Sequence, residues 1–309
     1  QRNFIDNDIY MQVFNSAGTP LLSEPVVIVD NFFIDDNVRF IESDSDGNIL
    51  IIYDSGDFSG TRVYAALVNE SGELVWNQRL STEESDQFSR GIAKTDTGFF
   101  VIWKDQRSGS SDIYGQAISF DGTLQGPGSG IPITTESNDQ QSPSLSYNNI
   151  TDNIVVCWED FRNGADFDIY CSEIDESTLS VNQFELCVAN GNQKTPDVFS
   201  TLDGSSLFAW EDSRNGVTSD LFYQRMNPSG SMDQIANGVV LCDADFNQLN
   251  PKIEIYDELT NSYMIYWDDM RSSGKEDLSN IYLQSVTVNS DSSECVPSGD
   301  INSDNFVNV

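Results

Sequence analysis

The stretch W-E-D-F-R-N-G-A-D-F-D-I-Y, residues 158–170, decides how this chain is interpreted, because near-copies of it recur along the sequence. Copies begin at Trp103, Trp210 and Trp267, and a degenerate copy begins at Tyr53. These aromatic residues are separated by 50 to 57 residues. A motif shared at near-equal intervals indicates an internal structural repeat.

Each repeat contains four short segments that read as strands, which we name A to D. They are rich in β-branched and aromatic residues and are bounded by Gly, Asn, Asp and Ser, as strands in tight hairpins are. In one repeat they are residues 143–147, 154–158, 168–172 and 184–188. Four antiparallel strands in each of several repeats predict an all-β fold, a β-propeller of four-stranded antiparallel blades.

The pattern of Arg and Gly followed by Asp-Ile-Tyr resembles the PD40 repeat of TolB-type propellers. The resemblance extends over most of residues 1–290, which we expect to form one propeller domain. The Trp-x-Asp-x-Arg half of the motif departs from the PD40 pattern. The resemblance therefore implies the fold more than the function.

The number of blades depends on how the N-terminus is interpreted. Strand A occurs five times, which favours five blades, whereas strand C occurs six times because residues 8–10 (Asp-Ile-Tyr) are a further copy. The given sequence begins inside a B–C loop. Either its first strands complete the last blade, or an upstream half-repeat is missing and the propeller has six blades.

Residues 291–309 are expected to be a linker followed by the start of a calcium loop. Oxygen-bearing side chains at loop positions 1, 3, 5 and 9, with a backbone carbonyl at position 7, suit calcium. The segment resembles the first loop of a type I dockerin, truncated before its twelfth position; an Asp/Asn-rich tail is the alternative. The resemblance implies calcium as a cofactor, with these ligands: Asp300, Asn302, Asp304, Phe306 (through its carbonyl) and Asn308.

The composition excludes several classes of function. The formal net charge is −35, which disfavours nucleic acid and anionic membrane surfaces as partners. No apolar stretch is long enough for a membrane span. The chain has no histidine, so catalysis would depend on carboxylates, Tyr, Lys or Arg. The negative charge suits a soluble protein in a salty or calcium-containing medium. With the resemblances to PD40 repeats and a dockerin loop, we expect a secreted or cell-surface bacterial protein.

An acidic and a basic residue follow the aromatic residue in each full copy of the motif. Because every copy carries them, we interpret them as architecture: Asp and Arg pair within each loop, and a following Asp/Asn-Gln pair ties neighbouring blades. No residue stands out as catalytic or as a ligand for an organic cofactor. The repeated structural residues are Trp103, Asp105, Arg107, Trp158, Asp160, Arg162, Trp210, Asp212, Arg214, Trp267, Asp269 and Arg271.

The cysteines predict one disulfide. If Trp158 faces Tyr170 across the B–C hairpin, Cys157 faces Cys171, within the distance that a disulfide spans. No pairing is predicted for Cys187, Cys242 and Cys295.

Three functions remain open from the sequence. The favoured one is a non-catalytic binding or scaffold propeller, not an enzyme, whose partner is an extracellular protein or a glycan. The first alternative is a polysaccharide-active enzyme, a glycoside hydrolase-like protein with catalytic carboxylates and a dockerin. The second is an extracellular structural subunit that self-associates through its chain ends by strand addition.

Overall fold

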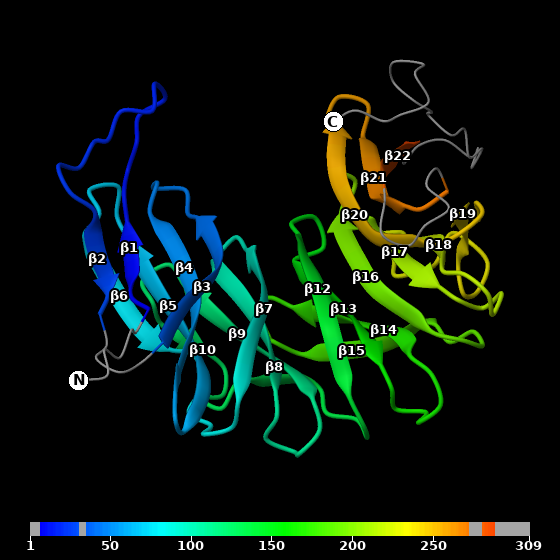
Figure 1. Ribbon diagram of the computed structural model, residues 1–309, viewed down its shortest axis with the longest axis horizontal. Coiled ribbons are helices and arrows are strands. Elements are labelled where there is room, and N and C mark those ends of the chain that lie inside the picture. Colours follow the sequence, from blue (N-terminus) through cyan, green and yellow to red (C-terminus); the bar gives the residue numbers. More distant parts are fainter. Residues whose placement is uncertain (1–6, 31–34, 272–279, 288–309) are drawn as a thin grey trace. The chain divides into compact units, whose positions relative to one another are not determined.

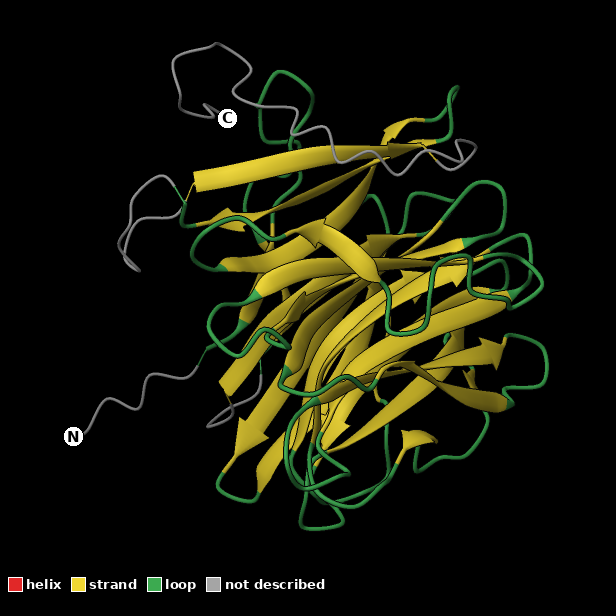
Figure 2. Cartoon of the chain, turned by 90° about the vertical axis from the view of Figure 1, so that its right-hand side faces the viewer, coloured by secondary structure: helices red, strands yellow, loops and turns green. Residues whose placement is uncertain are grey.

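The computed structural model describes residues 7–30, 35–271 and 280–287. All regular elements in these ranges are strands (Figures 1 and 2). None of the described residues forms a helix that could cross a membrane. The chain divides into two compact units, residues 1–140 and 141–309, which are described separately. The predicted calcium ligands, and the whole 291–309 segment, lie outside the described residues.

Unit 1 contains three antiparallel sheets. The first is a hairpin of β1 (Ile9–Met11) and β2 (Val26–Val29). The second has the order β3 (Asp35–Ser43), β4 (Ile49–Asp57), β5 (Gly60–Val68) and β6 (Leu74–Arg79). The third has the order β7 (Gln87–Lys94), β8 (Gly98–Asp105), β9 (Asp112–Ser119) and β10 (Leu124–Gln125), and β11 (Ile131–Thr134) also pairs with β9.

Unit 2 continues the same arrangement from β12 (Gln140–Asn148), whose first residue is the last of unit 1. β12 is followed in its sheet by β13 (Asn153–Asp160), β14 (Asp168–Asp175) and β15 (Val181–Cys187). The next sheet contains β16 (Gln193–Ser200), β17 (Ser206–Asp212), β18 (Asp220–Met226) and β19 (Val239–Cys242). The last contains β20 (Gln248–Asp257), β21 (Ser262–Asp269) and β22 (Asn280–Thr287).

The predicted all-β propeller of four-stranded antiparallel blades is confirmed, whereas the number of blades stays a prediction. Within unit 2, the core forms where consecutive sheets face each other. Val155 and Ile169 of one sheet pack with Phe208 and Trp210 of the next. The B strand β17 is an almost continuous apolar run, because the sheets that contain β13 and β21 cover its two faces.

In β16 and β20, a bulge near the start of the strand determines where the backbone amides at the bulge point. The register shifts between Lys194 and Asp197 in β16 and between Leu249 and Lys252 in β20. Thr195 and Asn250, inside these bulges, have φ values of 51° and 55°. A bulge turns backbone groups away from the ladder. The amide nitrogens of both residues therefore point at the preceding sheet.

Candidate functional site

The repeated tryptophans are buried, and each donates a hydrogen bond to the aspartate two residues further along strand B. Trp103, Trp158 and Trp210 are completely buried, and Trp267 is 4% exposed. The distances from the indole nitrogen to the aspartate oxygen are 2.8 to 3.0 Å. Because an indole N–H needs a partner when it is buried, the aspartate completes the packing of the aromatic residue.

The repeated arginines pair with the same aspartates, within their own loops. The ion pairs measure 2.5 to 2.6 Å, as in Arg162 to Asp160. Each guanidinium also lies over the ring of the facing C-strand residue, 3.7 Å from the ring centre for Arg162 and Tyr170. Burial of Asp105 opposes its ionisation, but hydrogen bonds from Arg107, Trp103 and Ser85 outweigh burial and lower the pKa of Asp105 to about 2.

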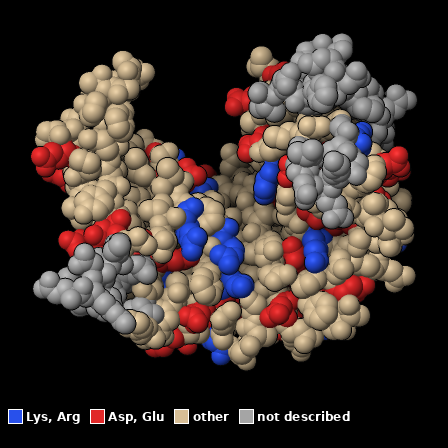
Figure 3. All heavy atoms as spheres, viewed as in Figure 1, with Lys and Arg blue, Asp and Glu red and all other residues tan. Residues whose placement is uncertain are grey.

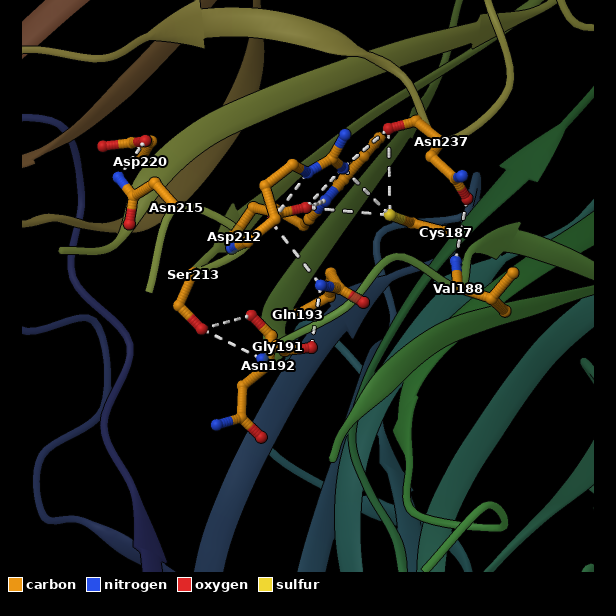
Figure 4. A network of polar contacts seen from close by, with 12 residues as sticks. Cys187, Val188, Gly191, Asn192, Gln193, Asp212, Ser213, Asn215, Asp220 and Asn237 are labelled. Carbon is orange, nitrogen blue, oxygen red and sulfur yellow. Dashed lines mark hydrogen bonds and ion pairs between the residues drawn. The ribbon is translucent and has the colours of Figure 1, made fainter. Parts of the chain in front are cut away.

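The glutamine that starts β7, β12, β16 and β20 acts in two ways. Its side chain bonds within its own sheet, as Gln87 does in donating to Asp105 over 2.9 Å, and its main chain ties neighbouring sheets, as the Gln193 amide does in donating to the Phe167 carbonyl of the preceding sheet over 2.7 Å. The residue before the glutamine adds a second tie between sheets. Asn192, for example, accepts a hydrogen bond from the Phe167 amide of the preceding sheet. Figure 4 shows the equivalent network around Asp212, where Gln193 and Cys187 converge on the carboxylate.

Because this network recurs from sheet to sheet, it is structural, and a functional site is better sought where the repeat is broken. One break occurs four residues after the A-strand glutamine. The residue there is Gly91 in β7, Ser144 in β12, Asp197 in β16 and Lys252 in β20. An acid thus stands between a hydroxyl and an ammonium group on consecutive sheets of unit 2.

Asp197 is buried and contacts both neighbouring A strands. Its Oδ1 accepts hydrogen bonds from Lys252 Nζ at 2.6 Å and Ser144 Oγ at 3.3 Å. Its Oδ2 accepts one from the Ile253 amide at 2.8 Å. The carboxyl is 11% exposed, whereas the Lys252 side chain is half-exposed. The ammonium group and the two other donors fix the position of the carboxyl group.

Two further carboxyl groups are joined through Thr195, two residues before Asp197 in β16. The Thr195 amide donates to Glu159 Oε1 at 3.0 Å, and its hydroxyl donates to Glu211 Oε1 at 2.8 Å. The second oxygen of Glu159 accepts from Gln141, also at 3.0 Å. Glu211 Oε1 additionally accepts from the Asn250 amide at 2.8 Å. Among the described residues, none donates to Glu211 Oε2.

Glu211 and Asp197 lie in different electrostatic environments, and this difference affects proton transfer. Burial is the largest influence on Glu211, and together with the nearby charge of Glu159 it raises the pKa of Glu211 above its usual value. Asp197 carries a counter-ion instead. Carboxyl groups in different environments, one of them with a raised pKa, are the arrangement used for general acid–base chemistry.

None of these residues is predicted from the sequence to be catalytic. The signal that points to Asp197 is the comparison of repeats at one position, because Ser144 and Lys252 occupy it in the neighbouring copies. Glu159 and Glu211 give a weaker signal, since an acid follows the B-strand aromatic residue in most copies.

Of the four cysteines among the described residues, two form a disulfide and two are free. The structure pairs Cys157 with Cys171 in a disulfide across the β13–β14 hairpin, where the two residues face each other. Cys187 and Cys242 are free thiols. Burial raises the pKa of Cys187 to about 12, so this thiol is unreactive at neutral pH.

In the part of the chain that the structure describes, no group of three or more Cys, Asp or Glu residues has the geometry of a metal site.

No family model matches the chain. None of the curated proteins is similar in sequence. Among solved structures, a protein of unknown function from Dyadobacter fermentans DSM 18053 has a TM-score of 0.52 at 10% identity, covering 85% of this chain and 81% of that one. The α-L-arabinanase of Penicillium chrysogenum, complexed with arabinobiose, has a TM-score of 0.48 at 13% identity, with coverages of 91% and 86%. The endo-arabinase of Bacteroides thetaiotaomicron has a TM-score of 0.42 at 14% identity, with coverages of 81% and 93%.

These findings agree with the β-propeller class and correct two expectations. The preference for a non-catalytic binding or scaffold protein, and for a chain that is not an enzyme, is wrong. The similar structures whose names state an activity are enzymes, among them arabinanases, levansucrases and glycoside hydrolases of family 43.

Proposed function

We propose that the protein is a polysaccharide-active, glycoside hydrolase-like enzyme that uses carboxyl groups of unit 2. The observation that carries the proposal is the Thr195 bridge, which holds Glu211 and Glu159 together beside the ion pair of Asp197 and Lys252. Hydrolysis of a glycosidic bond needs one protonated and one ionised carboxyl group. These groups supply both kinds without a histidine.

Glu211 is the proton donor in this proposal. Its raised pKa keeps a larger fraction of the carboxyl group protonated near neutral pH. Because no described residue donates to Oε2, this oxygen is available to give its proton to the oxygen of the leaving sugar. Thr195 and Asn250 hold the other oxygen and so fix the orientation of the group.

Asp197 is the second carboxyl group of the proposed site. Three donors hold its two oxygens in a fixed position, and Lys252 compensates its charge. A carboxylate held in this way activates water or stabilises the positive charge that develops on the sugar ring. Lys252, which is half-exposed, is also placed to donate a hydrogen bond to a sugar hydroxyl.

We also propose the repeat type, the calcium loop, the localisation and the partners that the sequence predicts. The repeats are PD40/TolB-like, and the segment 291–309 is a dockerin-like module that binds calcium through Asp300 and its neighbours. The protein is secreted or on the cell surface, and its partner is a glycan or an extracellular protein. The net charge of −35 supports a partner other than nucleic acid or membrane.

Release of reducing ends from a panel of plant and algal glycans tests the proposal. We expect the wild-type protein to cleave at least one glycan, and Asp197→Asn to lower kcat by about 10²-fold or more. Glu258→Gln is the matched control, because Glu258 is exposed in the β20–β21 turn of the same unit. Wild-type protein that is inactive on the whole panel, or Asp197→Asn with full activity, would contradict the proposal.

A further inference from the structure

A second break in the repeat lies in unit 1, where three basic residues replace acidic or neutral ones. The residue after the B-strand aromatic residue is acidic in four copies (Asp54, Glu159, Glu211 and Asp268), whereas in β8 it is Lys104. The third residue after the A-strand glutamine is proline in unit 2 (Pro143, Pro196 and Pro251), whereas in β7 it is Arg90. In β3 the corresponding residue is Arg39.

The fold brings these three residues together. Arg90 Cζ and Lys104 Nζ lie 5.8 Å and 5.7 Å from the centre of the Phe88 ring. Burial is the largest influence on the Arg90 guanidinium and lowers its pKa; the charge of Asp54 opposes this effect, and the charge of Arg39 adds to it. Arg39 itself bonds Asp54 over 2.8 Å. In Figure 3, basic side chains gather on the visible face of unit 1.

Two of the three cations form no ion pair among the described residues, although the charge of Asp54 acts on Arg90 at longer range. Within the described ranges, neither Arg90 nor Lys104 has a carboxylate within 4.0 Å, although the chain has 50 acidic residues and only 15 basic ones. Arg90 makes one hydrogen bond, to the carbonyl of Ser89. The acid of the cluster, Asp54, is already occupied by Ser89 and Arg39.

Like charges held close together repel each other, so such a cluster costs stability unless an anion neutralises it. The ties between sheets do not require a basic residue at position 104. In other copies of the repeat, an acid at this position makes the tie. Glu159 and Glu211, for instance, accept the amide of the next A strand. A negatively charged ligand would therefore stabilise the cluster.

We propose that Arg39, Arg90 and Lys104, with Phe88, form a binding site for the carboxylate or sulfate group of an acidic glycan. The guanidinium groups match planar oxyanions with paired donors, and the ammonium group adds a point charge. Phe88, which is half-buried, supplies an apolar surface for the sugar ring. That the anion is part of a glycan rests on the proposed function; that the cluster binds an oxyanion does not.

Isothermal titration calorimetry at low ionic strength tests this site with four probes: an oligogalacturonate, a sulfated oligosaccharide, a neutral arabinan oligosaccharide and free sulfate. The variants are Lys104→Glu, which restores the acid found in other copies, and Arg90→Gln. Lys94→Gln is the matched control, because Lys94 lies on the same strand β7 and likewise has no ion pair among the described residues. Circular dichroism establishes that each variant is folded.

We expect the wild type to bind one or both acidic oligosaccharides, and both variants to weaken binding at least about tenfold, since charged hydrogen bonds are lost. Lys94→Gln should bind as the wild type does, and added salt should weaken binding. Comparison of the uronate with the sulfated probe identifies the anionic group. Equal binding of the neutral oligosaccharide, no binding, or full binding by Lys104→Glu would overturn the inference. Binding of free sulfate alone would support the oxyanion site and overturn its assignment to a glycan.

Glu211→Gln separates this inference from the proposed function. If the inference is correct, this variant binds the acidic oligosaccharide as tightly as the wild type does, whether or not the wild type cleaves it. Binding without cleavage of any glycan would support the site and contradict the enzyme. Cleavage that is unaffected by Lys104→Glu, together with unchanged binding, would support the enzyme and overturn the site.

Discussion

The hydroxyl of Thr195 donates a hydrogen bond to Glu211 Oε1 over 2.8 Å, linking the bulge of β16 to the B strand of the same sheet. This bond lowers the pKa of Glu211, against the larger opposing effect of burial. The same threonine holds Glu159 through its amide. Its backbone and side chain thus fix two carboxyl groups at once.

Replacing Thr195 by valine removes the hydroxyl and keeps the branched shape. We expect the pKa of Glu211 to rise further, because one hydrogen bond to its ionised form is lost. If Glu211 is the proton donor, the alkaline limb of the kcat/KM profile moves to higher pH, and stability falls by about 1 kcal/mol. Thr195→Ser, which retains the hydroxyl, should leave the limb in place. A valine variant with an unchanged profile would contradict the link.

Asp160 is completely buried, and its carboxylate binds the Trp158 indole and the Arg162 side chain. In Asp160→Asn a partly buried guanidinium loses its counter-charge, so we expect a loss of about 3 kcal/mol in the free energy of unfolding. Urea denaturation measures the loss. Asp245→Asn, at an exposed position, should change stability by less than about 0.5 kcal/mol. Similar stabilities for both variants would show that the repeated ion pair is dispensable.

Gly238 packs against the tryptophan of its own sheet. It has a φ of 71°, and an added Cβ would overlap the Trp210 ring. Gly238→Ala should therefore lose about 2 to 4 kcal/mol, combining backbone strain with overpacking. Gly230 has a φ of 81° but open space around the added atom, so Gly230→Ala should lose only the strain, about 1 kcal/mol. Thermal unfolding of both variants compares them, and equal losses would contradict the packing argument.

Asp168 makes stability depend on pH. Its burial, followed by the charge of Asp166, raises its pKa from 3.8 to about 6. The folded state therefore binds a proton more tightly than the unfolded state, and stability falls as pH rises from about 4 to 6. Asp168→Asn should be more stable than the wild type at pH 7, by on the order of 1 kcal/mol. The difference should disappear near pH 3, where both side chains are neutral. A variant that is less stable at pH 7 would contradict this origin of the pH dependence.

The sequence predicts best those features that repeat. The motif at 158–170 is sufficient to align Trp158 with Tyr170, and the β13–β14 register has this pairing, with Cys157 opposite Cys171. Pairing of Asp160 with Arg162 also follows from the motif, because the two residues are two positions apart in one loop.

The carboxyl site is harder to predict because its contacts connect different sheets. Lys252 and Asp197 are 55 residues apart, and the bulge in each A strand shifts the register that a simple strand alternation would give. Thr195 also looks unremarkable in the sequence, since its role depends on a φ of 51°. Contacts of this kind appear only when the sheets are placed side by side.

The most direct test of the central claim is how the activity of Glu211→Gln depends on the leaving group. A general acid is needed when the leaving group is a sugar alkoxide, but not when it is a stable phenolate. We predict that Glu211→Gln loses about 10² to 10⁴-fold in kcat/KM on the glycan that the wild type cleaves, and keeps most of its activity on the matching dinitrophenyl glycoside. Equal losses on both substrates, or no loss on the glycan, would contradict the assignment of Glu211 as the proton donor.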